Sequence, residues 1–388
     1  MKKLRALIVG QEIELIMSLP SLLVRSGFEV DCLSNNHLLK KNKYLKNYHA
    51  VSSMKEMIEV LHYKDLSPYD FIILTNDEMI CDVAQSSMSI ERKLKLLPVC
   101  SEKNFSHLFS KIGLSEILTA ENITTPQFFV AQNFWDLKDK AERLGYPCMV
   151  KLNSSNGGRG VFECQSLADF DEIKEKITVY PVLLQQKIIG RELDLSAIYQ
   201  AGELIHFSYS VIEKVIFNKF GPSSLRNYYQ LGNFDEKLFS EMKALGKALG
   251  ADGFTTISCI HSFADNKRYF IEADMRPNAW VEFPRFIGDD PAQYLRNWFS
   301  KKEGMSFSNA LNANYPLIRQ MPYFLRIKNF EVLTNRYQVW SFMSFEDWRI
   351  FFRKNKFLAR QKFRQFIANL NFFSPKLLQR FFSISQRG

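Results

Sequence analysis

A lysine and a glycine-rich loop stand close together in the run from Pro147 to Val161, PCMVKLNSSNGGRGV. Lys151 follows a short apolar stretch that predicts a buried strand. Arg159 adds a forked donor that can bind two oxygens at once. The loop holds three glycines that let backbone N–H groups approach a ligand: Gly157, Gly158 and Gly160. The spacing is neither that of a Walker A loop nor that of G-x-G-x-x-G opening a helix. The combination suits a polyphosphate, and the alternative is a glycine-rich hairpin with a solvent-facing lysine.

Two carboxylates lie two residues apart in a second stretch, KRYFIEADMRPN, from Lys267 to Asn278. On a strand, Glu272, Asp274 and Arg276 share one side. Mg²⁺ prefers one or two carboxylates together with phosphate oxygens and water. A solvated strand face with an ion pair is the alternative. Because a lysine and a glycine loop precede these carboxylates, the order of the motifs favours magnesium bound to phosphate.

The chain resembles the ATP-grasp superfamily of ATP-dependent carboxylate–amine or carboxylate–thiol ligases over roughly its first three quarters. Ser110 to Val130, SKIGLSEILTAENITTPQFFV, is similar to the family's entry stretch, in which a lysine opens a helix before a Gly-Ile-Pro-x-Pro turn. Lys111 stands where the family has its first ATP lysine. Asn122 replaces the usual glycine, and asparagine tolerates the left-handed conformation of such a turn.

The resemblance implies roles for the other motif residues. Lys151 matches the second ATP lysine, and the loop from Ser154 to Gly160 would close over the phosphates. The hinge strand from Gln185 to Ile188 would bind adenine through its backbone. The implied nucleotide-binding residues are Lys111, Lys151, Ser155, Gly157, Gly158, Gly160, Gln185, Gln186, Lys187, Ile188 and Glu192. The implied catalytic residues are Arg276, Lys151 and Arg159, and the implied metal ligands are Glu272 and Asp274.

One position departs from the family's metal site. The family has a third ligand, an Asp, Glu or Gln, on the preceding strand, where alignment places Ser258. A serine hydroxyl is a poor magnesium ligand. His261 lies nearby, but a lone histidine on a strand is more often a hydrogen-bonded or surface residue than a ligand. The site would therefore hold fewer or weaker ions, use water in the gap, or belong to a member without efficient turnover.

The resemblance implies a reaction and its substrates. ATP and Mg²⁺ would be bound, and ATP would phosphorylate a carboxylate to an acylphosphate that an amine attacks, releasing ADP and phosphate. No nucleophilic side chain is needed. The alternative is a degenerate, nucleotide-binding ATP-grasp protein with a regulatory or membrane-associated role. A homodimer is left open.

The composition is that of a folded protein, with 46% hydrophobic and 24% charged residues among 388. The start, Met-Lys-Lys-Leu-Arg followed by Ala6 to Gly10, predicts a strand rather than a signal peptide. No uncharged apolar run approaches the length of a membrane span. The six cysteines show no C-x-x-C pair, which predicts reduced cysteines in a cytoplasmic protein.

The first part of the chain predicts a small Rossmann-like unit with a parallel sheet. A helix is expected over Ile13 to Ser26, between the first two of three strands: Arg5 to Gly10, Phe28 to Ser34 and Tyr69 to Asp77. Asp77 and Glu78 follow the last of these strands, where open parallel sheets place ligand contacts. A solvated loop is the equal alternative there.

The predicted fold class is α/β, with α+β character in the ATP-binding part. We expect a Rossmann-like domain over 1–108 and an ATP-grasp domain of two α+β subdomains over 109–305. The smaller, central subdomain would span about 126–190. A basic, aromatic-rich and mainly helical region would follow over 306–388.

The C-terminal segment is strongly basic, with fourteen lysines and arginines against three acids from Arg319 to Gly388. Aromatic residues are interleaved with the basic ones. Such a segment can dock on the rest of the protein, lie on the inner face of an anionic membrane, or bind nucleic acid. No nucleic-acid motif is present, so specific nucleic-acid binding is not expected.

Overall fold

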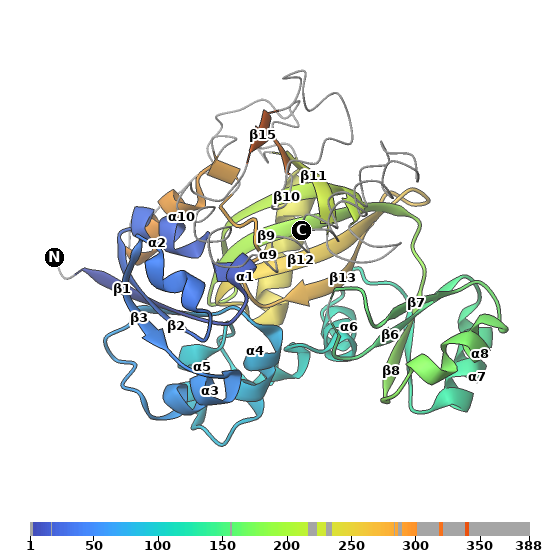
Figure 1. Cartoon of the computed structure of the whole chain (residues 1–388). Helices are drawn as coiled ribbons and strands as arrows, with labels where there is room; N and C mark the ends of the chain where they lie inside the picture. The colour runs from blue at the N-terminus through green and yellow to red at the C-terminus, as the bar shows by residue number, and fades with distance from the viewer. Residues whose placement is uncertain are drawn as a thin grey trace, which may run out of the picture.

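The computed structural model describes residues 3–16, 18–155, 157–215, 223–229, 235–282, 284–285, 289–300, 318–320 and 338–340. In these residues the strands form three sheets (Figure 1). A parallel sheet comes first, a small antiparallel sheet second, and a large, mostly antiparallel sheet last. The predicted fold class, a parallel-sheet unit followed by two α+β units, is confirmed.

The N-terminal sheet has the strand order β3-β2-β1-β4, and its strands are parallel. The strands are β1 (Leu4–Val9), β2 (Phe28–Ser34), β3 (Leu45–Ala50) and β4 (Phe71–Leu74). The helices are α1 (Ile13–Ile16), α2 (Leu19–Arg25), α3 (Met54–Tyr63), α4 (Asp77–Gln85) and α5 (Ile90–Leu96), with 3₁₀ turns η1 (His37–Lys41) and η2 (Glu102–His107). Apart from Arg5, β1 is apolar, and its last four residues are buried because both faces of a parallel sheet are covered.

Two expectations for this unit are wrong. The single helix expected over Ile13 to Ser26 is two helices, and Pro20 lies in the first turn of α2, where its missing N–H is tolerated. The strand expected to reach Asp77 ends at Leu74, and Asp77 opens α4.

The small sheet has the order β5-β8-β6-β7. Its strands are β5 (Phe128–Ala131), β6 (Cys148–Leu152), β7 (Val161–Cys164) and β8 (Val182–Gln186). Helices α7 (Phe134–Leu144) and α8 (Asp169–Ile173), with η3 (Lys174–Lys176), cover one face and enclose a separate core that includes Leu137, Val150 and Phe170. Asn133 caps α7, since its side chain accepts from Trp135 N and Asp136 N. Helix α6 (Lys111–Ala120) lies beside this unit (Figure 1).

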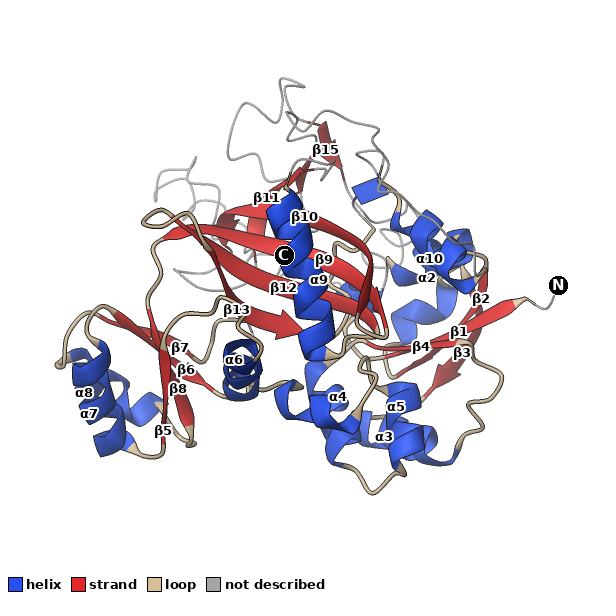
Figure 2. Ribbon diagram, turned by 180° about the vertical axis from the view of Figure 1, so that it is seen from behind, coloured by secondary structure: helices blue, strands red, loops and turns tan. Residues whose placement is uncertain are grey.

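The large sheet has the order β13-β12-β9-β10-β11-β14-β15. Its strands are β9 (Gly190–Gln200), β10 (Glu203–Val215), β11 (Ser223–Tyr229), β12 (Gly253–Ser262), β13 (Arg268–Asp274), β14 (Ile318–Gln320) and β15 (Gln338–Trp340). Helix α9 (Glu236–Leu249) crosses one face (Figure 2), and Gly250 ends it in the left-handed conformation at φ 56°. Helix α10 (Pro291–Phe299) packs against α2.

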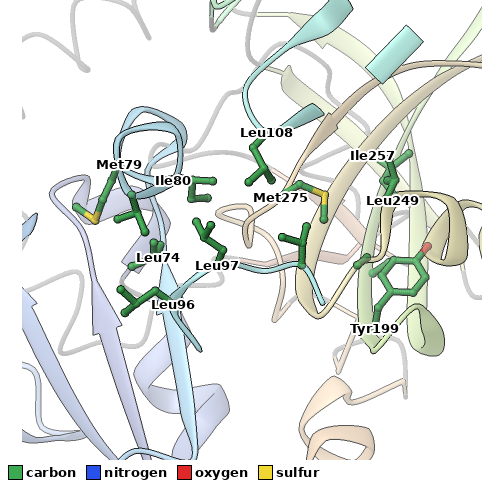
Figure 3. Packing of buried hydrophobic residues seen from close by; sticks show 14 of the residues in the cluster. Leu74, Met79, Ile80, Leu96, Leu97, Leu108, Tyr199, Leu249, Ile257 and Met275 are labelled. Carbon is green, nitrogen blue, oxygen red and sulfur yellow. The ribbon is translucent and has the colours of Figure 1, made fainter. Parts of the chain in front are cut away.

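One hydrophobic core joins the N-terminal unit to the large sheet. It contains Leu74, Met79 and Ile80 from the first unit together with Ile257 and Met275 from the sheet (Figure 3). These two parts therefore pack as one body, whereas the small sheet has its own core.

The predicted basic, mainly helical region lies outside the described residues apart from β14 and β15, which are short strands. In the described part of the chain, no helix is long and apolar enough to cross a membrane. None of the six cysteines forms a disulfide, and four of them are buried: Cys32, Cys148, Cys164 and Cys259.

Candidate functional site

Lys151 lies near the end of β6, on the side of the small sheet that α7 and α8 leave uncovered. Its neighbour Val150 belongs to the core under those helices, so Lys151 points to the other side. The turn from β6 to β7 carries the glycine loop, in which Gly157 and Gly158 have φ of +60° and +75°. These left-handed values explain the glycines. Arg159 is exposed in this turn.

The amine of Lys151 is buried and has a neutral partner. The residue is 7% exposed, and its Nζ donates to Gln185 Oε1 at 2.8 Å. The pKa of Lys151 is lowered to about 8, chiefly by burial and in part by the charge of Lys111, while Glu272 and Glu192 oppose the shift. Within the described structure, Gln185 Nε2 is buried without a hydrogen-bond partner. A buried cation beside a donor suits an anionic, acceptor-rich ligand.

Lys111 connects the glycine loop to the carboxylate strand. Its Nζ donates to Ser155 O at 2.6 Å and lies 3.4 Å from Glu272 Oε1. The start of α6 is fixed by Asn153, whose backbone oxygen accepts from Lys111 N and whose side chain accepts from Ile112 N. Asn122, after this helix, has φ 56°, which confirms the left-handed turn. The structure therefore brings together both predicted lysines, the loop and Glu272.

The carboxylate strand β13 ends at Asp274, so Arg276, which the sequence predicts to lie on the strand, follows it by two residues. Three charged side chains meet at Arg276. Arg276 Nη2 lies 2.9 Å from Asp274 Oδ2 and 2.7 Å from Asp77 Oδ2. Burial raises the pKa of Asp274 well above its usual range and also raises that of Asp77, although Arg276 opposes both shifts. Burial lowers the pKa of Arg276, but the negative charges of Asp274 and Asp77 outweigh this effect and raise it. Asp77 is buried, so the solvated-loop alternative is wrong for this residue.

The two carboxylates fit a magnesium ion that takes its other ligands from phosphate and water. Ser258 on β12 is the cross-strand partner of Glu272, as the sequence alignment expects. In the described residues, no group of three or more His, Cys, Asp or Glu is arranged to hold a metal. His261 instead shares a hydrogen bond of 2.7 Å with Asn266 Oδ1.

Of the hinge residues predicted to form a strand, Gln185 and Gln186 lie in β8, and Lys187 and Ile188 follow it. Gln186 ends that strand and is exposed. Lys187 forms an ion pair of 2.6 Å with Glu163 on β7, and Ile188 is half-buried. Glu192 lies near the start of β9 and is exposed.

Two side-chain contacts at the site were not predicted from the sequence. One is Asp77 with Arg276, which are separated by 199 positions. The other is Gln185 with Lys151, where the hinge residue contributes its side-chain amide. Only the contact between Gln185 and Lys151 could have been inferred beforehand, because antiparallel pairing of β6 with β8 puts both residues on one face of the sheet.

No family model matches the chain. It is 30% identical over 193 residues to a D-alanine–D-alanine ligase of Thermotoga maritima, an alignment that covers 46% of this chain and 57% of the ligase. It is 27% identical over 179 residues to the carbamoyl phosphate synthase large chain of Corynebacterium glutamicum, covering 43% of this chain and 16% of that protein. The aligned part thus spans less than two thirds of the length of these relatives.

Solved structures share the fold. The biotin carboxylase domain of the Hydrogenobacter thermophilus 2-oxoglutarate carboxylase, solved as a dimer with MgADP, ADP and bicarbonate, has a TM-score of 0.62 at 14% identity, covering 79% of this chain and 72% of that one. An L-amino acid ligase of Bacillus licheniformis has a TM-score of 0.57 at 17% identity, covering 76% and 74%. At these identities the likeness establishes the fold alone.

Proposed function

Because the chain belongs to the ATP-grasp superfamily, we propose that it is an ATP-dependent ligase that joins a carboxylate to an amine. The D-alanine–D-alanine ligase and the L-amino acid ligase are named for this kind of reaction. The meeting of Lys111, Lys151 and Glu272 in one place supports the nucleotide site.

One observation carries the proposal: the amine of Lys151 is buried against the neutral amide of Gln185. A permanently buried lysine without a carboxylate partner destabilises the folded chain. A phosphate oxygen would supply the missing negative charge. Lys111 beside the glycine loop would offset further charge on the same polyphosphate.

Glu272 and Asp274 would hold magnesium, which supplies charge neutralisation between phosphate oxygens. Because Ser258 stands where a third carboxylate would lie, the protein would provide only two carboxylates, and water and phosphate would complete the coordination. This arrangement makes a weaker ion site than three protein carboxylates would.

The reaction proceeds in two displacements. An oxygen of the substrate carboxylate attacks the γ-phosphorus of ATP, and the bond to ADP breaks, so ADP leaves with the bridging oxygen. The amine then attacks the carbonyl carbon of the acylphosphate, phosphate leaves, and the proton from nitrogen passes to solvent. Lys111, Lys151, Arg159 and Arg276 offset the phosphate charges. Closure of the glycine loop would exclude the water that hydrolyses the acylphosphate.

Calorimetric titration with the non-hydrolysable analogue AMP-PNP, with and without magnesium, tests the nucleotide site. We expect magnesium-dependent binding that Lys151→Ala weakens by about 30-fold or more, because loss of one partner of a buried charge contact costs about 2 kcal/mol or more. Lys138→Ala is the matched control, because Lys138 lies on α7, away from this face, where it pairs with Asp171. Equal affinity in wild type and Lys151→Ala would refute the site.

Binding alone does not establish ligation. ADP release should therefore be screened with amino acids and small carboxylates, with mass spectrometry to detect the new C–N bond. Nucleotide binding without release under any pairing would favour the degenerate alternative. A homodimer and a membrane-surface role stay predictions.

A further inference from the structure

The guanidinium of Arg276 is held on one edge by a residue from the N-terminal unit. Its Nε donates to Asp77 Oδ2 at 2.8 Å, and its Nη2 lies 2.7 Å from the same oxygen. Nη2 also donates to Asp274 Oδ2 at 2.9 Å. Nη1 has a long contact of 3.4 Å with Pro277 O. Asp77 thus occupies the Nε–Nη2 edge and leaves Nη1 with the weakest contact.

Both partners are anchored by buried neighbours. Asp77 opens α4 and is 7% exposed, and Met79 of the same helix lies in the shared core. Met275, next to Arg276, lies in that core too (Figure 3). Because packed cores resist displacement, the Asp77 carboxylate has a fixed position relative to the end of β13.

Stability does not account for this contact. A buried ion pair adds little net stability, and the shared core already joins the two units. Arg276 also faces two carboxylates, so the three side chains, if all are ionised, carry an excess negative charge. The excess is useful if Asp274 turns to a metal ion and Asp77 remains on the arginine.

We propose that Asp77 is a positioning residue that holds Arg276 by its Nε–Nη2 edge, so that Nη1 is presented to the phosphoryl group in transfer. The inference rests on the function proposed above. When Asp274 binds the metal, Asp77 keeps the guanidinium in place, and the arginine needs no reorientation as charge develops on the phosphoryl oxygens.

The test compares the full-length chain's affinity for MgADP with and without aluminium fluoride, which imitates the phosphoryl group in transfer. In wild type we expect aluminium fluoride to tighten MgADP binding by at least about 100-fold. Asp77→Asn should keep its affinity for MgADP alone and lose about 10- to 100-fold of this gain, because the arginine is displaced. Asp82→Asn, at an exposed position of α4, is the matched control and should keep the full gain.

A double variant distinguishes a positioning role of Asp77 from a purely structural role, in which the contact only links the two units. Asp77→Asn with Arg276→Lys should lose no more of the gain than Arg276→Lys alone, because Asp77 acts through the arginine. If the contact only links the two units, Asp77→Asn should instead lower the melting temperature and leave the gain from aluminium fluoride intact. Asp77→Ser, for which the same loss is expected, replaces Asp77→Asn if that variant does not fold.

The outcomes are distinguishable. A full gain in Asp77→Asn, or additive losses in the double variant, overturns the inference. Wild-type binding of MgADP without any gain overturns it as well and leaves the nucleotide site standing. Failure of wild type to bind MgADP overturns the proposed function and this inference together.

Discussion

Lys151 is a cation at a position that disfavours charge. Burial lowers its pKa to about 8, from 10.5 for the unperturbed side chain. Between these values the unfolded chain binds more protons than the folded chain, so this residue's contribution to the unfolding free energy rises with pH. Below about pH 8 the buried charge costs stability in full. The ligand-free protein thus carries an unfavourable charge that a bound phosphate would compensate.

This pKa predicts a pH-dependent affinity. We expect AMP-PNP affinity in the presence of magnesium to fall as the pH rises through about 8, because Lys151 loses its proton. Calorimetric titration between about pH 6.5 and 9.5 measures the change. Lys151→Arg stays charged throughout and should show a flatter profile. A flat wild-type profile would mean that the lysine charge does not contribute to binding.

The charged residues of the site could be predicted from spacing, but their contacts could not. Lys151, Glu272 and Asp274 were found because each lies on a predicted strand at a position typical of phosphate or metal chemistry. Asp77 was placed at a strand end, yet its pairing with Arg276 depends on how α4 packs against the end of β13. No local pattern carries that information.

At the scale of elements, capping chemistry accounts for where helices begin and end. Asn133 and Gly145 bound α7, and Gly250 ends α9 in the left-handed conformation. The prediction of one helix over Ile13 to Ser26 was wrong, because a continuous apolar periodicity does not show that a second helix begins at Leu19 with Pro20 in its first turn.

The register of β12 against β13 makes the missing metal ligand testable. Ser258 pairs with Glu272, and cross-strand partners share a face, so an aspartate there would lie beside the candidate metal. We expect Ser258→Asp to raise Mn²⁺ affinity about tenfold, measured by electron paramagnetic resonance, and to raise magnesium-dependent turnover.

Ser258→Asn is the matched control, because asparagine has nearly the same shape as aspartate but carries no charge. Its metal affinity should stay close to that of wild type. Unchanged affinity and rate in Ser258→Asp would count against the alignment at this position.

At the scale of the whole molecule, the described residues pack as two bodies. The N-terminal unit and the large sheet share two hydrophobic clusters, and the small sheet has its own. The parallel sheet of the first unit could be predicted from its alternation of strands and helices, and the order of the later units from the resemblance to the ATP-grasp superfamily. The sharing of a core could not, because Leu74, Ile257 and Met275 are ordinary apolar residues whose partners are set by tertiary packing.

The candidate site includes residues of both the small sheet and the large sheet, so a bound ligand should couple them. Lys151 and Gln185 belong to the small sheet, and Glu272 belongs to the large one. We expect AMP-PNP with magnesium, at a hundred times its Kd, to slow amide exchange in β6 and β8 by up to about 100-fold and to change β1 little. Hydrogen exchange with mass spectrometry measures this.

Lys151→Ala should remove the added protection at matched ligand concentration. Equal protection across all three sheets, or protection confined to the N-terminal sheet, would contradict a site between the two bodies.

The contact between Asp77 and Arg276 also constrains recombination. A chimera that takes its first unit from one relative and its large sheet from another would exchange one partner without the other. Unless the donor unit brings an acid at the start of the equivalent helix, the arginine would lose its orientation even in a well-folded hybrid. For this chain, a crossover that preserves chemistry must therefore keep the two units together and can fall only around the small sheet.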